Sequence, residues 1–238
     1  MKKNEIGVVL FDWDFTLAYT LGDVSLDQRI AALFKHVGLP YGQQAVEEVL
    51  EDYRNAVERG QARPLHRMQR RRDIVALYRY ILARLGHSEL SRELMYRIYS
   101  AYAHLPTKLY DDARPSLQTL QERGLKLGIL SNHSVSVRAV VERLVGDYIP
   151  SENITISEEI GVHKPSKTIF QRAAARLAAP PASCLYVGDN LAVDALAAVQ
   201  VGGYGMGLWL DRRGKGTTRE LPENVARITS LHQVVDFI

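Results

Sequence analysis

Short, continuous apolar runs recur near the start of the chain and through its second half. They are five to seven residues long, contain few polar residues, and are flanked by turn-forming residues. Runs of this kind are typical of strands in a parallel sheet whose two faces are both covered. We therefore predict buried parallel strands at 6–11, 125–130, 153–157, 184–189 and 204–210.

Helical patterns fill the intervals between the later strands, where apolar residues recur at helical spacing. The first of these segments has a proline early and a glycine at its end, the asymmetry expected of a helix. Alternating strands and helices imply right-handed crossovers, so we predict an α/β fold with a doubly wound, Rossmann-like parallel sheet. The expected helices span 115–124, 134–146, 165–178 and 191–202.

A different pattern occupies residues 21–105, where the periodic segments are helical and none resembles a strand. We predict about four helices here, forming an all-helical domain inserted after the first strand. The predicted organisation is a Rossmann-like core made of 1–20 and 106–238, interrupted by a helical domain at 21–105. The first helix is expected to place five apolar residues on one face: Leu26, Ile30, Leu33, Phe34 and Val37.

Composition narrows the class of protein. The 238 residues carry a formal net charge of +3, a mildly basic balance that would not repel an anionic substrate. A single cysteine, Cys184, excludes an intramolecular disulfide and a cysteine cluster for zinc, and we expect it to be buried. The apolar stretch after MKKNE is too short for a signal peptide or a membrane span, so we expect a cytoplasmic protein without a membrane partner. Monomer and homodimer both stay open.

Two basic segments suggest a polyanionic ligand at first sight. Arg67, Arg70, Arg71 and Arg72 lie at helical spacing, which is more typical of a solvated helix face. The stretch GKGT at 214–217 resembles the end of a phosphate-binding loop, but glycine follows the lysine and the upstream glycine spacing is wrong. With a net charge this small, we expect no nucleic-acid partner.

Polar residues of several kinds follow the predicted strands. In an open α/β sheet, ligands bind outside the carboxyl ends of the strands, so these residues are the candidates for chemistry. Each of them could be a simple helix cap or a solvated residue, and only their combination indicates a site. They are Asp12, Asp14, Ser131, Asn132, Lys164, Asp189 and Asp194.

The pair Asp12 and Asp14 carries most of the chemical information. Two carboxylates this close repel each other, and a bound cation or a hydrogen-bond network is needed to offset that cost. Carboxylates are the ligands that Mg²⁺ prefers, and Mg²⁺ engages phosphate oxygens. One carboxylate can attack phosphorus while the second protonates the leaving group and then deprotonates water. Serine and lysine side chains can hold the phosphoryl oxygens. The pattern therefore favours phosphoryl transfer.

Four segments in this order, FDWDFTL, ILSN, HKP and VGDNLAVD, resemble the signature motifs of the haloacid dehalogenase (HAD) superfamily of hydrolases. The resemblance covers the whole chain, because the helical insert lies where that superfamily places its type-1 cap domain. It implies a phosphatase that forms an aspartyl-phosphate intermediate.

The resemblance also implies a role for each matching residue. Asp12 would be the nucleophile and Asp14 the general acid/base. Phosphate would be bound by Ser131, Asn132 and Lys164, with Thr16 supporting the loop and counted among the phosphate-binding residues. Magnesium would be held by Asp12, Asp14 through its backbone carbonyl, and Asp189, with Asp194 counted in the metal set or orienting Lys164.

Two positions refine the expected activity. The dehalogenating branch of the superfamily lacks a carboxylate at the position of Asp14, so we expect no dehalogenase. Most relatives have glycine where this chain has Phe15, which predicts a differently shaped loop. We expect a Mg²⁺-dependent phosphomonoester hydrolase of a small phosphorylated metabolite, similar to phosphoglycolate or nucleotide phosphatases. A sugar phosphomutase of the same superfamily and a receiver-like phosphoaspartate signalling module are the alternatives.

Overall fold

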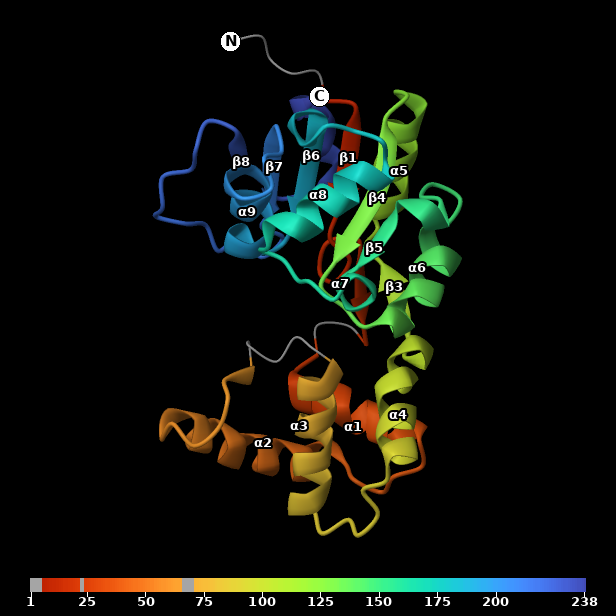
Figure 1. Cartoon of the computed structure of the whole chain (residues 1–238), viewed down its shortest axis with the longest axis vertical. Coiled ribbons are helices and arrows are strands. Elements are labelled where there is room, and N and C mark those ends of the chain that lie inside the picture. The colour runs from red at the N-terminus through yellow and green to blue at the C-terminus, as the bar shows by residue number, and fades with distance from the viewer. Residues whose placement is uncertain (1–5, 22–23, 66–70) are drawn as a thin grey trace. The chain divides into compact units, whose positions relative to one another are not determined.

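The computed structural model describes residues 6–21, 24–65 and 71–238. The chain divides into two compact units (Figure 1). Unit 1 comprises Met1–Tyr19 and Lys108–Ile238, and unit 2 comprises Thr20–Thr107. Both passages of the chain between the units run through a two-stranded sheet formed by β2 (Ala18–Thr20) and β3 (Thr107–Leu109).

Unit 1 contains a parallel sheet with the strand order β5-β4-β1-β6-β7-β8. The five strands predicted from the apolar runs are confirmed. The edge strand β8 was not predicted, because only its first and last residues are buried and it follows a long polar segment. The strands are β1 (Val8–Phe11), β4 (Lys126–Ser131), β5 (Ile154–Ile156), β6 (Cys184–Gly188), β7 (Met206–Leu210) and β8 (Val225–Ile228).

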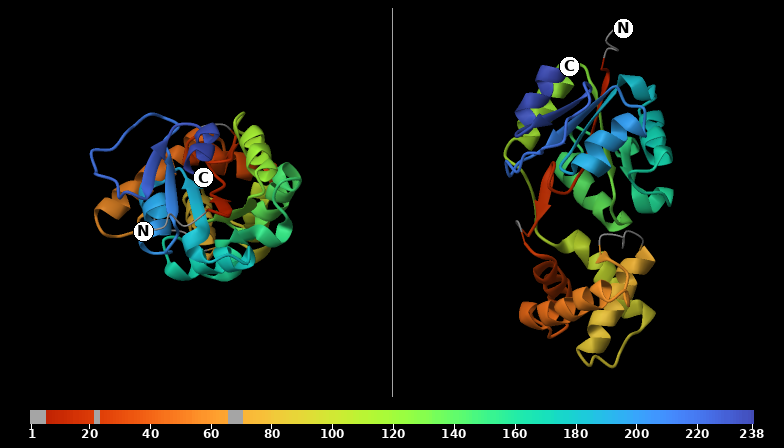
Figure 2. Two further views of the ribbon diagram at one scale, coloured as in Figure 1. Left: turned by 90° about the horizontal axis from the view of Figure 1, so that it is seen from above. Right: turned by 90° about the vertical axis from the view of Figure 1, so that its left-hand side faces the viewer.

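Helices cover both faces of this sheet (Figure 2). Helix α5 contacts the C-terminal 3₁₀ segment Leu231–Phe237 on one face, while α8 and α9 share a buried apolar cluster with β1 and β6 on the other. Buried Cys184 belongs to that cluster, as predicted. The helices are α5 (Ala113–Glu122), α6 (Arg138–Val145), α7 (Ser157–Ile160), α8 (Lys167–Arg176) and α9 (Leu196–Gln200).

The strand order places a topological switch at β1. From β1 the chain moves outward to β4 and β5, and then returns to the other side of β1 for β6, β7 and β8. In the ladders, Phe11 pairs with Ile129 of β4 and with Val187 of β6. The carboxyl ends of three neighbouring strands therefore lie side by side, which is where an open α/β sheet binds its ligands.

Unit 2 is helical apart from its share of the two-stranded sheet, within the part of the chain that the structure describes. Four of the five residues expected on the apolar face of the first helix are at least partly buried, but Leu26 is 39% exposed because it is the first residue of the helix. Arg71 and Arg72 are exposed, whereas Arg67 and Arg70 lie outside the described residues. The helices are α1 (Leu26–His36), α2 (Gln43–Glu58), α3 (Arg71–Arg84) and α4 (Arg92–Ser100). None of the described helices has the length and apolar character that a membrane crossing requires.

Candidate active site

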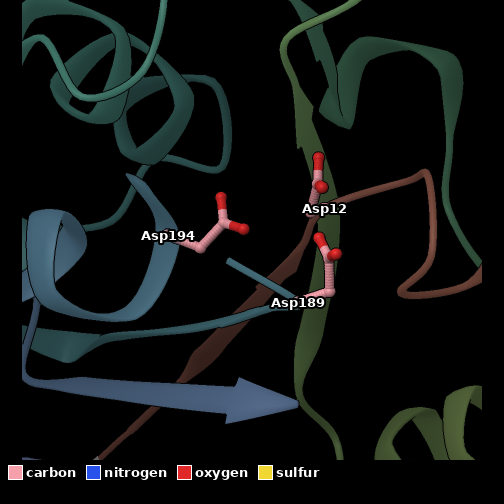
Figure 3. Close-up of side chains that lie close together, drawn as sticks. All are labelled: Asp12, Asp189 and Asp194. Carbon is pink, nitrogen blue, oxygen red and sulfur yellow. The ribbon is translucent and has the colours of Figure 1, made fainter. Parts of the chain in front are cut away.

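Three aspartates converge at the carboxyl ends of β1 and β6 (Figure 3). Each offers a carboxylate oxygen, and these oxygens lie within 4.8 Å of one another. Asp12 directly follows β1, and its N–H donates to the carbonyl of Val187 at 2.9 Å, which ties it to β6. Asp189 directly follows β6. We call Asp12, Asp189 and Asp194 the acidic cluster.

Lys164 provides the positive charge at this cluster. Its Nζ donates to Asp12 Oδ1 at 2.9 Å, to Asp194 Oδ1 at 2.7 Å and to the Tyr186 hydroxyl at 2.8 Å. These bonds use the three N–H donors of an ammonium group, as burial of the lysine demands. The Tyr186 hydroxyl in turn donates to the carbonyl of Leu130 at 2.6 Å. The aspartates and Lys164 were singled out from the sequence, and Tyr186 was not.

Among the described residues, the charge of the acidic cluster is not balanced by ion pairs. When ionised, its three carboxylates carry three negative charges against the one positive charge of Lys164. Burial, reinforced by the charges of Asp12 and Asp194, raises the pKa of Asp189 to about 7. Burial also raises the pKa of Asp194, although the ammonium of Lys164 opposes the shift. Burial alone would lower the pKa of Lys164, but Asp12 and Asp194 raise it.

The residue types and charge of the acidic cluster fit a divalent cation. Carboxylate oxygens are suitable ligands for Mg²⁺, and two further positive charges would neutralise the cluster. Asp194 contributes differently from the other two aspartates. Its Oδ1 accepts from Lys164 and its Oδ2 accepts from the Asn190 N–H at 3.0 Å. Both oxygens of Asp194 are therefore already engaged by the protein.

Gly188 makes room for the carboxylate of Asp194. A Cβ atom at position 188 would lie 2.4 Å from Asp194 Cγ, a separation that no side chain tolerates. The Asn190 side chain accepts hydrogen bonds from the N–H groups of Ala192 and Val193, both at 3.1 Å, and so caps the π-helical turn Leu191–Ala195. The segment GDN thus presents Asp189 to the site. The turn that follows brings the carboxylate of Asp194 against Gly188, where it accepts a hydrogen bond from Lys164.

Asp14 lies on a tight loop after β1. The N–H groups of Leu17 and Ala18 both donate to the carbonyl of Trp13, at 3.1 Å each, which closes this loop. The side chain of Asp14 is 23% exposed, and its Oδ2 lies 3.5 Å from His133 Nε2. Phe15 adopts the left-handed backbone conformation, with φ of 60°, that glycine would adopt with less strain.

The residues predicted to bind phosphate differ in their hydrogen-bond partners. Ser131 is the last residue of β4 and is buried. The Asn132 side chain holds the backbone of Lys164 at both ends, donating to its carbonyl at 3.0 Å and accepting from its N–H at 2.7 Å. Thr16 is buried, and its backbone carbonyl accepts from Arg212 at 2.8 Å. Phosphate binding by Ser131, Asn132 and Thr16 stays a prediction.

Comparisons with known proteins place the chain among hydrolases. A family model described as haloacid dehalogenase-like hydrolase matches residues 6–202. Over 96 residues the chain is 42% identical to a glyceraldehyde 3-phosphate phosphatase of Methanopyrus kandleri, covering 40% of this chain and 41% of that protein. Over 125 residues it is 34% identical to an (S)-2-haloacid dehalogenase of Pseudomonas putida, covering 52% and 53%. The chain thus spans about half or less of the length of these curated relatives.

The fold is similar to that of the HAD hydrolase YfnB from Bacillus subtilis, whose crystal structure was solved with magnesium bound. The TM-score is 0.69 at 19% identity, and the match covers 98% of both chains. At this identity the likeness shows the fold alone. The curated relatives include both a phosphatase and a dehalogenase, so similarity alone does not distinguish the two reactions.

Proposed function

Because the chain belongs to the haloacid dehalogenase-like hydrolase family, we propose that it is a magnesium-dependent phosphatase of small phosphorylated metabolites. The observation that carries the proposal is the buried acidic cluster with its single lysine. In this proposal unit 2, the helical unit Thr20–Thr107, is the cap domain, and unit 1 is the catalytic core.

Asp12 is the nucleophile. Lys164 holds its Oδ1 at 2.9 Å, which fixes the carboxylate and leaves its second oxygen to attack phosphorus. The new bond joins this oxygen to phosphorus, the ester P–O bond breaks, and the leaving oxygen takes a proton. The positive charge of Lys164 opposes the repulsion between the carboxylate and the incoming phosphate.

Asp14 supplies that proton and later removes one from the attacking water. Water then forms a bond to phosphorus, the bond between phosphorus and Asp12 breaks, and inorganic phosphate leaves. An alkoxide leaving group needs this proton, whereas a halide ion leaves without one. The carboxylate of Asp14, partly exposed beside the buried cluster, therefore favours a phosphatase over a dehalogenase.

The magnesium ligands would be the side chains of Asp12 and Asp189 and the backbone carbonyl of Asp14. When bound, Mg²⁺ would neutralise the acidic cluster and polarise the phosphoryl oxygens. Asp194 positions Lys164 and the backbone of Asn190, because its two oxygens accept hydrogen bonds from Lys164 Nζ and from the Asn190 N–H. Ser131 and the Asn132 backbone would bind the phosphoryl oxygens.

The test is phosphate release from a panel of phosphorylated metabolites, with and without Mg²⁺, for the wild type and Asp12→Asn. We expect release that requires Mg²⁺ and is lost in the variant, whose side chain is nearly isosteric and should leave the fold intact. Stoichiometric inorganic phosphate separates a phosphatase from a phosphomutase, which returns the phosphoryl group to its substrate. Unchanged turnover in Asp12→Asn would contradict the proposed nucleophile.

A further inference from the structure

Arg212 follows β7 by two residues and reaches the loop that carries Asp14. Its Nη2 donates to the backbone carbonyl of Thr16 at 2.8 Å. The same guanidinium holds the carboxylate of Asp112 in a bidentate pair, with Nη2 to Oδ1 at 2.8 Å and Nη1 to Oδ2 at 3.0 Å. Arg212 therefore joins three segments of unit 1 that lie far apart in the chain: the loop after β1, the residue before α5 and the segment after β7.

The ring of Tyr110 also contacts this guanidinium. The central carbon of the Arg212 guanidinium lies 3.8 Å from the centre of the ring, a short cation–π distance. Tyr110 is itself tied to the same loop, because its N–H donates to the carbonyl of Leu17 at 3.0 Å. Two successive carbonyls of the loop are thus held from outside it, one by Arg212 and one by Tyr110. A planar guanidinium suits this arrangement, since it can pair with a carboxylate, donate to a carbonyl and lie over a ring at once.

The loop held in this way is strained at Phe15. Its φ of 60° lies in the left-handed region, and a bulky residue persists there only where the surrounding structure imposes the conformation. The carbonyl that Arg212 holds belongs to the next residue, and Asp14 is the residue before. The bond from Arg212 therefore fixes the backbone two residues from the proposed general acid, across the strained position.

Arg212 also lines a pocket of about 260 Å³ whose wall includes Asp189, and a cation in such a place could instead bind the substrate. Two observations favour a role within the protein. The positive charge of Arg212 is matched by the carboxylate of Asp112. Both terminal nitrogens of the guanidinium already donate to protein acceptors, one of them the backbone of the loop that carries Asp14. Its charge and geometry therefore serve the protein's own structure.

We propose that Arg212 is a positioning residue for Asp14, the general acid of the proposed phosphatase. The inference rests on that proposed function, because it takes Asp14 as the group that protonates the leaving oxygen. By holding the Thr16 carbonyl, Arg212 sets the backbone from which the carboxylate of Asp14 reaches the leaving group. Loss of this bond should slow protonation of the leaving group and affect the attack by Asp12 much less.

The experiment compares two esters that differ in how much their leaving group needs a proton: the most rapidly hydrolysed alkyl phosphate of the panel, and p-nitrophenyl phosphate. The p-nitrophenolate ion leaves without protonation, whereas an alkoxide requires it. Because kcat/KM covers every step up to departure of the leaving group, it isolates the half-reaction in which Asp14 acts as an acid. For Arg212→Lys we expect kcat/KM to fall about tenfold more for the alkyl ester than for p-nitrophenyl phosphate. Asp14→Asn, which removes the acid itself, should show the same difference in larger measure.

The ratio of the two kcat/KM values does not depend on how much of a variant is folded, so a loss of stability alone does not change it. Asp112→Asn weakens the grip on the same guanidinium and should shift the ratio in the same direction, by less. Arg227→Lys is the matched control, because Arg227 also pairs with a buried aspartate, Asp211, which lies outside the loop. It should keep the wild-type ratio.

The outcomes separate the two levels of inference. Equal losses for the two esters in Arg212→Lys, or no loss for either, would overturn the positioning role and leave the phosphatase function standing. A shift of the ratio in Arg227→Lys as large as that in Arg212→Lys would also overturn it. Equal losses for the two esters in Asp14→Asn would remove the general acid, and with it the role of Arg212. No phosphate released from either ester by the wild type would overturn the proposed function and the inference together.

Discussion

Unit 1 holds two sets of largely buried carboxylates that differ in how their charge is compensated. Asp112 and Asp211 are each paired with one arginine, Arg212 and Arg227, and each accepts further hydrogen bonds from the backbone. The acidic cluster instead shares a single lysine among three carboxylates. Within the described parts of the chain, the charge of the first set is balanced by ion pairs, and the charge of the acidic cluster is not.

The pKa values of Asp112 and Asp211 move in the opposite direction to those of Asp189 and Asp194. Burial alone would raise the pKa of Asp112 and of Asp211, but the arginines and backbone N–H groups lower both. For Asp189 and Asp194 burial prevails, and the pKa of Asp189 rises to about 7. Carboxylates that a protein keeps buried without full compensation are candidates for function. The balanced pairs hold Arg212 and Asp211 in place, and the unbalanced cluster is the candidate site for the cation and the chemistry.

The largest expected effect follows from removing the one cation of the acidic cluster. Lys164→Met would leave Asp12 and Asp194 without their buried partner, and we expect a loss of about 3–5 kcal/mol in the free energy of unfolding together with loss of activity. Arg227→Met is the matched control, since Arg227 is partly exposed and should cost about 1 kcal/mol or less. Denaturant unfolding measures both. Similar losses in the free energy of unfolding for the two variants would contradict the proposed difference between the two sets of carboxylates.

The second prediction concerns the pH dependence of stability without Mg²⁺. Because the pKa of Asp189 is raised from 3.8 to about 7, the native state binds this proton more tightly than the unfolded state between these values. The free energy of unfolding should therefore fall as pH rises from about 4 to 7, by an amount on the order of 3 kcal/mol. For Asp112 and Asp211, whose pKa values are lowered, the sign is opposite: stability should fall as pH drops below 3.8.

Urea unfolding of the wild type and of Asp189→Asn between pH 4 and 7 measures the part of the pH dependence that Asp189 causes. The variant should lose much of the decline between pH 4 and 7, because its amide does not titrate. Saturating Mg²⁺ should flatten the decline in the wild type, since the cation stabilises the ionised carboxylates. A wild-type profile that rises through this range would contradict the unbalanced cluster.

A smaller effect is expected from removing the Tyr186 hydroxyl, which accepts a hydrogen bond from Lys164. Tyr186→Phe removes one hydrogen bond to its Nζ, and we expect kcat to fall about tenfold with KM little changed, since Lys164 and Asp12 lose part of their positioning. Tyr204 offers a matched control, because it is buried in the same cluster and its hydroxyl donates to the carbonyl of Phe170 at 2.8 Å. Tyr204→Phe should cost comparable stability, about 1 kcal/mol, and retain kcat. Equal kcat in the two variants would remove Tyr186 from the positioning network.

Much of unit 1 could be predicted from the sequence because its strands are short apolar runs that end in polar residues. Asp12 and Asp189 follow their strands directly, so the position of each strand end also gives the position of a site residue. Tyr186 was missed because it lies within a strand, although a tyrosine in an apolar run signals a hydroxyl that needs a partner. The roles of the Asn132 side chain and of Asp194 depend on which groups meet across the fold, and no spacing along the chain encodes that.

The pocket that Asp189 lines together with Trp209 and Lys215 was the least accessible to sequence analysis. Lys215 belongs to the GKGT stretch, which lacks the glycine spacing of a phosphate-binding loop, yet the fold brings this residue to a pocket shared with Asp189. The pairs that fix it join residues far apart in the chain, such as Asp112 and Arg212. Only the folded sheet brings them together.

The most direct test of the unbalanced cluster is a calorimetric titration of the protein with Mg²⁺ near pH 7, in buffers of different ionisation enthalpy. We predict binding of one ion with release of protons, because Asp189 is partly protonated at that pH and must ionise to bind. Asp189→Asn should bind far more weakly and release fewer protons. Absence of Mg²⁺ binding to the folded wild type, or binding that Asp189→Asn leaves unchanged, would contradict the assignment of the acidic cluster as a cation site.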